Sequence, residues 1–321
     1  MFDVVALGEL LIDFTPAGHT PAGSPVFEAN PGGAPANVLA AVSKLGGKSA
    51  FIGKVGDDQF GHFLEEVLKS HGIDTAGLSF SDSANTTLAF VHLDQKGERS
   101  FSFYRNPGAD IMLDVQDIKP EIIADTRIFH FGSLSLTHEP ARSATLHALN
   151  LAKKKNKVIS FDPNWRPPLW KDDAAAREGM FLGLQSADIL KLSEEEMEFL
   201  TGEQDLEKGS GKLFDMGIKL VLVTMGEKGC FYRCSSGTGS VKAYDVRVLD
   251  TTGAGDAFMG ALLYGICKRG ILLDEINIQE LEGILDFASA AGGLCTTKRG
   301  GIPAMPTLEE VRLCMKNIKK L

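Results

Sequence analysis

The sequence predicts a doubly wound α/β core with a small β-sheet lid attached to it. Short apolar runs alternate with amphipathic helical segments along most of the 321 residues. This rhythm is typical of a mostly parallel sheet covered by helices on both faces. Two segments break the rhythm and do not fit a parallel sheet, so we expect them to form a separate small sheet.

The core elements follow from the spacing of the apolar residues. Strands are expected at Val4–Gly8, Ala50–Val55, Arg127–Phe131, Val158–Asp162, Ile189–Leu192 and Leu220–Thr224. Helices are expected at Ala36–Leu45, Phe60–His71, Pro140–Lys154, Ala174–Gln185 and Glu194–Thr201. Alternation of this kind assigns residues 1–14, 32–85 and 111–321 to the α/β core.

The lid is assigned to residues 15–31 and 86–110. The first segment is rich in Pro, Gly and Ala, and the second contains two alternating runs around the turn Asp94–Gly97. Alternating runs on either side of a Gly-containing turn predict an antiparallel hairpin. Because a hairpin has no obvious place in a parallel array, we expect it to project from the core, where it could cover a ligand.

The lid also suggests how the protein assembles. A projecting sheet has an unpaired edge, which is exposed unless another chain covers it. Val91, Phe101 and Phe103 add apolar side chains to this region. We therefore expect a homodimer that forms through the lid.

Composition narrows the class of protein. The formal net charge is -9, so binding to nucleic acid or to anionic membranes, which depends on an excess of Lys and Arg, is not expected. No apolar run approaches the roughly 20 residues that span a bilayer. The five cysteines lack paired C-x-x-C spacing, which is typical of reduced thiols in a cytoplasmic protein. If this acidic protein handles phosphates, backbone N–H groups and a divalent cation must supply much of the positive potential.

Residues 250–256, with the sequence DTTGAGD, are the most informative stretch. Gly253, Ala254 and Gly255 let the backbone approach a ligand, and their N–H groups begin a helix whose positive end favours an anion. Asp256 stands beside that anion hole as a candidate base for an incoming hydroxyl, which is the combination that phosphoryl transfer needs. A Gly-rich turn with an Asp that caps a helix would look the same.

Residues 32–37, with the sequence GGAPAN, open another helix. The glycines again allow a close approach of the backbone, and Asn37 offers both a donor and an acceptor, which suits a sugar hydroxyl. A Pro near the first helical position is also an ordinary helix start. This stretch alone therefore does not decide the function.

Together the two stretches resemble the paired signatures of the ribokinase-like carbohydrate kinase family, and the resemblance extends over essentially the whole chain. Within that family the chain is most similar to the fructokinases, on the fragments GELLIDF (8–14), PGGAPANV (31–38), FIGKVGDDQFG (51–61), FYRNPGAD (103–110), FGSLSLTHEPAR (131–142) and FDPNWRPPLW (161–170). The resemblance implies a ribokinase-like fold and the phosphorylation of D-fructose to fructose 6-phosphate with Mg·ATP. Asp256 would be the general base, and the N–H groups of Gly253, Ala254 and Gly255 would form the anion hole.

The resemblance also implies a set of ligand contacts. Asp13, Gly33 and Asn37 would bind the sugar hydroxyls. Arg166 and, from the lid, Arg105 would close over the sugar, with Asn164 nearby. The adenosine end of ATP is expected at Thr224, Gly226 and Gly229, with Lys191 as a further candidate. A K⁺ ion would be held by oxygens of Asp250, Thr252, Cys295 and Gly300.

The magnesium contact implied by the resemblance is Glu196, acting through water. It ends the stretch Ser193–Glu196, which takes the place of the family's Asn-x-x-Glu element with Ser instead of Asn. A Ser followed by acids is also an ordinary helix cap. Both interpretations of Glu196 stay open from the sequence.

Two other functions stay open as well. The 2-keto-3-deoxygluconate kinases share a similar DPN-x-R segment and a Tyr-x-Arg in the lid, although the carboxylate of their substrate would need an additional basic contact. A non-catalytic sugar-sensing protein could keep the fold, but it would have no need for a base such as Asp256. A P-loop at Leu45–Ser49 is excluded because that segment runs from helix to strand, the reverse of the required order.

Overall fold

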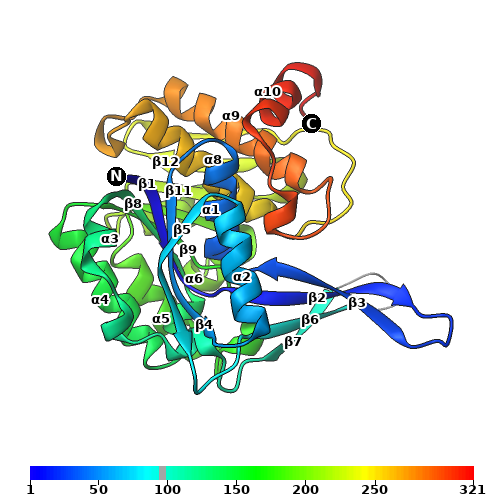
Figure 1. Ribbon diagram of the computed structural model, residues 1–321. Helices are drawn as coiled ribbons and strands as arrows, with labels where there is room; N and C mark the ends of the chain where they lie inside the picture. Colours follow the sequence, from blue (N-terminus) through cyan, green and yellow to red (C-terminus); the bar gives the residue numbers. More distant parts are fainter. Residues whose placement is uncertain (94–98) are drawn as a thin grey trace.

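A nine-stranded sheet forms the centre of the molecule (Figure 1). The structure is a computed structural model that describes residues 1–93 and 99–321. The strands lie in the order β13-β12-β11-β10-β9-β8-β1-β4-β5, and all neighbours are parallel except β11–β12 and β12–β13. Their bounds are β1 Phe2–Leu7, β4 Ser49–Gly56, β5 Ile73–Ser81, β8 Thr126–Gly132, β9 Val158–Asp162, β10 Ile189–Ser193, β11 Leu220–Thr224, β12 Cys230–Cys234 and β13 Gly237–Val241.

Helices cover both faces of this sheet, which confirms the predicted doubly wound core. One face packs against α1 Ala34–Lys44, α2 Gln59–Ser70, α8 Ala254–Arg269, α9 Ile278–Cys295 and α10 Leu308–Asn317. The other face packs against α3 Pro120–Ala124, α4 Ala141–Lys154, α5 Asp173–Leu184, α6 Glu194–Thr201 and α7 Leu206–Phe214. The chain therefore has two apolar layers, one on each side of the sheet.

Strand β1 shows why the sheet must be covered on both sides. Val4 and Ala6 belong to one apolar layer, whereas Val5 and Leu7 belong to the other, and all four are 0% exposed. A strand that is apolar on both faces is stable only between two layers of helices. His130 and Ser160 are a polar pair inside the sheet, hydrogen-bonded to each other at 3.0 Å, whereas the candidate site lies at the edge where the parallel strands end.

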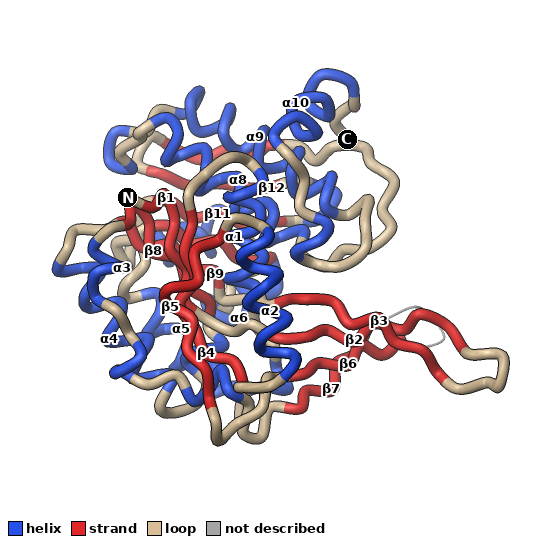
Figure 2. Tube along the Cα trace, in the orientation of Figure 1, coloured by secondary structure: helices blue, strands red, loops and turns tan. Residues whose placement is uncertain are grey.

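A second sheet of four strands projects from the core, as Figure 2 shows. Its order is β3-β2-β6-β7, with bounds β2 Leu11–His19, β3 Pro25–Gly32, β6 Leu88–Leu93 and β7 Arg99–Tyr104. The predicted hairpin is confirmed, because β6 and β7 pair antiparallel; the whole of the predicted turn Asp94–Gly97 lies outside the described residues. The small sheet begins at Leu11, earlier than residue 15, because β2 pairs with β3 from that point. The exact division into core and lid stays a prediction.

Asp58 links the core to the chain that enters this small sheet. Its carboxylate accepts hydrogen bonds from the N–H of Gly61, in the first turn of α2, and from both the N–H and the hydroxyl of Thr86, each at 2.8 Å. Thr86 is 3% exposed and lies just before β6. Burial raises the pKa of Asp58, but the hydrogen bonds from Thr86 and Gly61 outweigh it, so the pKa lies below its ordinary value.

Within the described ranges 1–93 and 99–321, no helix combines the length and the apolar character that crossing a membrane requires. The longest helix, α9, has 18 residues and packs into the core beside α8. Its apolar residues are therefore accounted for by packing within the protein.

Replacing Asp58 with Ala should lower the free energy of unfolding by about 1–3 kcal/mol, because the buried Thr86 N–H loses its acceptor. The folded-state pKa of Asp58 is depressed. Its stabilisation is therefore complete above the unfolded-state value of about 3.9 and is lost as the pH falls through the folded-state value. Urea unfolding at neutral pH and in acid should show the difference between wild type and Asp58→Ala narrowing in acid.

Asp172→Ala is the matched control, since Asp172 also caps a helix but, among the described residues, its carboxylate accepts only from Ala175 of its own α5. Asp172→Ala should lower the free energy of unfolding by less than Asp58→Ala does. Equal losses for the two variants, or a difference that does not change with pH, would contradict the role given to Asp58.

Candidate functional site

A cavity of about 390 Å³ opens where β1, β9 and β10 end and where α1 and α8 begin. Open parallel sheets commonly bind ligands at this edge. The structure brings ten of the residues expected from the sequence into its lining: Asp13, Gly33, Asn37, Asn164, Arg166, Lys191, Thr252, Gly253, Gly255 and Asp256. We call this space the sugar-side cavity.

The start of α8 forms the floor where an anion can bind. Gly253 is the residue before the helix and has a φ of 76°, in the left-handed region that glycine adopts without strain. Within the described residues no side chain caps this helix end. The N–H of Ala254 donates to the carbonyl of Thr251 at 3.3 Å, while Gly253 and Gly255 line the cavity, where the helix dipole favours negative charge. A Cβ added to Gly255 would lie only 2.8 Å from the ammonium nitrogen of Lys191, which shows how closely the two approach.

Asp256 lies in the first turn of α8 and is held from one side. The side-chain amide of Asn37 donates to Oδ2 of Asp256 at 2.8 Å. Burial raises the pKa of Asp256, while Lys191, the hydrogen bond from Asn37 and the charge of Arg166 lower it again. The carboxylate is thus fixed in place, more basic than an ordinary Asp, and keeps Oδ1 for another partner.

Asn37 makes a contact that the sequence did not predict, while its expected sugar contact stays a prediction. Its amide nitrogen is used by Asp256, and its Oδ1 is buried without a hydrogen-bond partner among the described residues. A buried acceptor without a partner is costly unless a ligand or water completes it. Asn37 therefore orients the carboxylate, and one oxygen remains for a ligand.

Lys191 is placed differently from the sequence expectation. It was expected near the adenosine end, but β10 ends beside α8, so the side chain points into the sugar-side cavity. Its ammonium pairs with Asp162 at 2.5 Å, and both side chains are less than a tenth exposed. Burial lowers the pKa of Lys191, but Asp162 and Asp256 outweigh it and raise it, so the ammonium stays charged. Burial raises the pKa of Asp162 to about 7, although Lys191 opposes this shift.

The rim of the cavity carries a further carboxylate and a guanidinium. Burial raises the pKa of Asp13 on β2 to about 7, with Arg166 as the main opposing charge. Asn164 has a φ of 47°, which is unusual for a residue other than glycine. Its amide and the Arg166 guanidinium supply donors opposite Asp13, so this rim can bind hydroxyl groups in several directions.

Trp165 fixes the loop that carries Asn164 and Arg166. Its indole ring stacks on Phe199 of α6 with a centroid distance of 3.9 Å. The guanidinium of Arg177 lies 4.1 Å from the same Phe199 ring. The loop is thus clamped between α5 and α6 by aromatic and cationic contacts.

Glu196 completes this clamp at the backbone. Its Oε1 accepts the N–H of Trp165 at 2.7 Å and its Oε2 accepts the N–H of Ser193 at 2.8 Å. Ser193 in turn accepts the N–H of Glu196 at 3.1 Å, which is the reciprocal helix cap left open by the sequence. A direct role of Glu196 toward a metal stays a prediction.

Arg105 lies outside the sugar-side cavity. It is 9% exposed and pairs with Asp110 through Nε at 2.7 Å and through Nη2 at 2.6 Å. Its remaining donors reach the hydroxyl of Thr137 and the carbonyl of Leu134, at 3.1 and 3.0 Å. The guanidinium therefore anchors the chain leaving β7 against the loop after β8.

The four residues expected to hold a monovalent cation do lie together. The carboxylate of Asp250 accepts the N–H of Thr252 at 2.8 Å and the N–H of Gly300 at 3.2 Å. The thiol of Cys295 lies 3.6 Å from the carbonyl oxygen of Thr252. Within residues 1–93 and 99–321, no group of three or more His, Cys, Asp and Glu side chains is arranged to hold a metal. Main-chain oxygens would have to provide most of the ligands.

A second cavity, of about 440 Å³, lies beside the first. Thr224, Gly226 and Gly229 line it as expected, and α9 contributes Ser289 and Gly292. Thr251 and Gly255 line both cavities. The two spaces thus meet at the start of α8, next to Asp256.

Sequence reasoning did not assign a site role to Glu9 or Asp162. Glu9 is 4% exposed, its Oε1 accepts the N–H of Ala34 at 2.9 Å, and its Oε2 has no partner within the described part of the chain. Burial raises the pKa of Glu9 to about 7. Asp162 is the last residue of β9 and Glu9 lies just after β1, and this position at the carboxyl end of a buried strand was the signal that could have found both.

Comparisons with known proteins show the family to which the chain belongs. Residues 1–308 match the family described as pfkB family carbohydrate kinase. The chain is 48% identical to fructokinase-2 of Oryza sativa subsp. japonica, over 95% of this chain and 91% of that protein.

Two solved structures are similar along nearly the whole chain. The crystal structure of fructokinase with bound ATP from Xylella fastidiosa has a TM-score of 0.91 and 35% identity, and it covers 98% of this chain and 99% of that one. Fructokinase from Vibrio cholerae O395, in its fructose, ADP and calcium ion bound form, has a TM-score of 0.87 and 34% identity, with 97% and 98% covered. These likenesses confirm the expected ribokinase-like fold. The chain belongs to the pfkB family of carbohydrate kinases and is a sugar kinase.

Proposed function

We propose that this sugar kinase transfers the γ-phosphoryl group of ATP to D-fructose, which gives fructose 6-phosphate and ADP. The observation that carries the proposal is the meeting of two cavities at the start of α8, beside the fixed carboxylate of Asp256. The names of the related fructokinases, and the fructose, ADP and ATP bound to two of them, support the choice of substrates.

In this mechanism Asp256 is the general base. The primary hydroxyl of fructose lies at Oδ1 while Asn37 holds Oδ2. As the hydroxyl oxygen bonds to the γ-phosphorus, its proton passes to Asp256 and the bond from the γ-phosphorus to the bridging oxygen of ADP breaks. The raised pKa of Asp256 makes the carboxylate a better proton acceptor, and the charges of Lys191 and Arg166 keep it ionised before the reaction.

The charge that develops on the transferred group is met by two kinds of donor. The N–H groups of Gly253, Ala254 and Gly255 would form the anion hole at the helix end. Lys191 adds a full positive charge at the same place. Because both are fixed before ATP binds, they need little rearrangement during the reaction.

The sugar would be oriented by the rim of the cavity. Asp13 accepts from hydroxyls, Arg166 and Asn164 donate to them, and the backbone at Gly33 lies close enough for a contact. Arg105 would position part of the cavity wall instead of contacting the sugar, because its guanidinium is engaged by Asp110. Leu134, whose carbonyl Arg105 holds, lines the sugar-side cavity.

Ions complete the proposal. Mg²⁺ would be carried by the nucleotide phosphates and reached by Glu196 through water, since each carboxylate oxygen keeps a lone pair beyond its backbone bond. The ion supplies positive charge that neutralises the phosphates when it is bound. K⁺ would take oxygens of Asp250, Thr252, Cys295 and Gly300.

A substrate screen tests the choice of sugar. Fructose should support ADP release at least about tenfold better, in kcat/KM, than ketodeoxygluconate, ribose or adenosine, because differential contacts in the sugar-side cavity decide specificity. The screen uses purified protein with saturating Mg·ATP and a coupled ADP assay. If ketodeoxygluconate outperformed fructose, the substrate assignment would be wrong, although the kinase assignment would stand.

We also propose a homodimer that forms through the lid. The small sheet carries a row of aromatic rings, in which Phe90 contacts Phe14, Phe27 and Tyr104 at centroid distances of 4.8, 5.5 and 5.4 Å. Tyr104 is 67% exposed and Phe27 is 37% exposed, and exposed apolar surface of this kind favours association.

The residues that the sequence suggested for this surface are placed differently. Val91 is only 6% exposed, and Phe103 lines the sugar-side cavity. The side chain of Phe101 lies outside the described part of the chain. The proposed interface therefore uses the other face of the strands.

Light scattering at micromolar concentration checks the assembly. Wild type should have the mass of a dimer, and Phe27→Asp should shift it to a monomer because a charge enters the aromatic row. Phe181→Asp on α5 is the matched control, since Phe181 has the same 37% exposure as Phe27. A monomeric wild type, or an equal effect of both variants, would count against the lid interface.

A further inference from the structure

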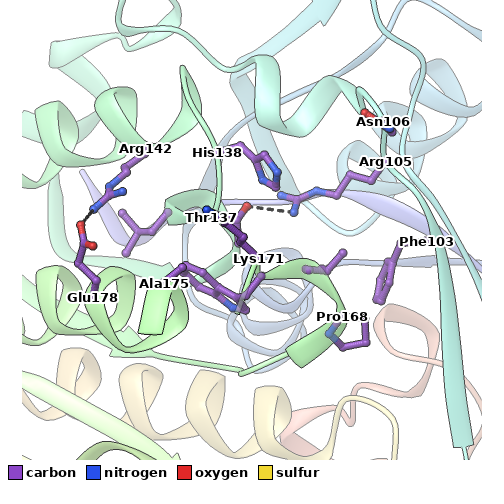
Figure 3. A pocket seen from close by; sticks show the side chains of 13 residues that line it. Phe103, Arg105, Asn106, Thr137, His138, Arg142, Pro168, Lys171, Ala175 and Glu178 are labelled. Carbon is purple, nitrogen blue, oxygen red and sulfur yellow. Dashed lines mark hydrogen bonds and ion pairs between the residues drawn. The ribbon is translucent and has the colours of Figure 1, made fainter. Parts of the chain in front are cut away.

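A third cavity, of about 440 Å³, lies between the lid and the helical layer of α4 and α5 (Figure 3). The chain that leaves β7 forms one side, with Phe103, Arg105 and Asn106. The loop after β8 and the loop after β9 form the rest, together with α5. Its size is in the range of small-molecule sites. Phe103 lines both this cavity and the sugar-side cavity, so the two are neighbours.

Positive groups predominate in its lining. Figure 3 shows Arg142 and Glu178 paired on one side and Arg105 on the opposite side. Arg142 meets Glu178 at 2.7 Å through one nitrogen, and Glu178 is 72% exposed, so this surface pair holds the guanidinium only weakly. Lys171 is exposed and has no ion pair with any described residue. In a chain of net charge -9, such a gathering of cations marks a place for an anion.

The other lining groups suit a sugar ring. Phe103, Leu136 and Trp170 give apolar walls against which the carbon face of a ring can pack. Asn106 and His138 add polar groups. Burial, and then the nearby Arg105, lower the pKa of His138, so the neutral imidazole both donates and accepts at neutral pH. The Nε1 of Trp170 is buried and has no partner within the described ranges.

We propose that this cavity binds a phosphorylated monosaccharide, at a site separate from the place of reaction. Lys171 and Arg142 hold the phosphate, while Asn106, His138 and Glu178 bind hydroxyls. The choice of fructose 6-phosphate as the probe rests on the proposed function, because it is the product of that reaction. The cavity would then bind the product of the reaction beside Phe103, the residue that also lines the sugar-side cavity.

Calorimetry tests the proposal with the reaction site filled. The protein is first titrated with fructose and a non-hydrolysable ATP analogue, which also tests the proposed function by itself. Fructose 6-phosphate is then titrated into the filled protein and should bind once per chain. Lys171→Glu and Arg142→Ala should each weaken this binding by about tenfold or more, with kcat and the fructose KM unchanged.

Lys316→Glu on α10 makes the same charge change outside the cavity and should leave the binding as in wild type. Inorganic phosphate alone, and fructose alone, should bind this site at least about tenfold more weakly than fructose 6-phosphate. The proposal is overturned if the filled protein gives no heat with fructose 6-phosphate. It is also overturned if Lys171→Glu and Arg142→Ala bind like wild type, or if phosphate alone binds as tightly.

Should fructose fail to bind in the first titration, the proposed function fails and the cavity is still tested. Fructose 6-phosphate is then titrated into the free protein and into the same variants. Lys171 and Arg142 line only this cavity among those described, so a loss of binding in both variants supports the site and unchanged binding refutes it.

Discussion

The structure depends on one constraint, the burial of the central sheet on both faces. Val4 to Leu7 are completely covered from two sides, and the polar side chains of the candidate site gather where the parallel strands end. Asp162, the last residue of β9, and Lys191, within β10, meet there as an ion pair at 2.5 Å. The start of α8 closes over the same edge, and this brings a carboxylate, an ammonium and a helix N-terminus into one cavity.

The charges at this edge explain how an acidic protein can handle phosphates. Burial raises the pKa of Glu9, Asp13 and Asp162 to about 7, so part of their negative charge is suppressed near neutral pH. Lys191 remains charged because its carboxylate neighbours raise its pKa. The local charge beside the anion hole is therefore less negative than the net charge of -9 for the whole chain suggests.

The sequence predicted the alternating core, the hairpin and most of the lining of the sugar-side cavity, because these follow from periodicity and from glycines next to helices. It did not predict the ion pairs of Lys191 and of Arg105. Their partners are Asp162 and Asp110, and such pairing leaves no local pattern. The hydrogen bond from the amide of Asn37 to Asp256 was not predicted either, because it joins residues far apart in the chain.

The most direct test of the central claim is the turnover of Asp256→Asn with saturating Mg·ATP, measured together with fructose binding by calorimetry. Asn can still accept the hydrogen bond from Asn37 but cannot take the proton, so kcat should fall by roughly 10²–10⁴-fold while fructose affinity stays close to wild type. Asp215→Asn, an exposed position at the end of α7, serves as the control. Turnover of Asp256→Asn within about tenfold of wild type would contradict the assignment of Asp256 as the base.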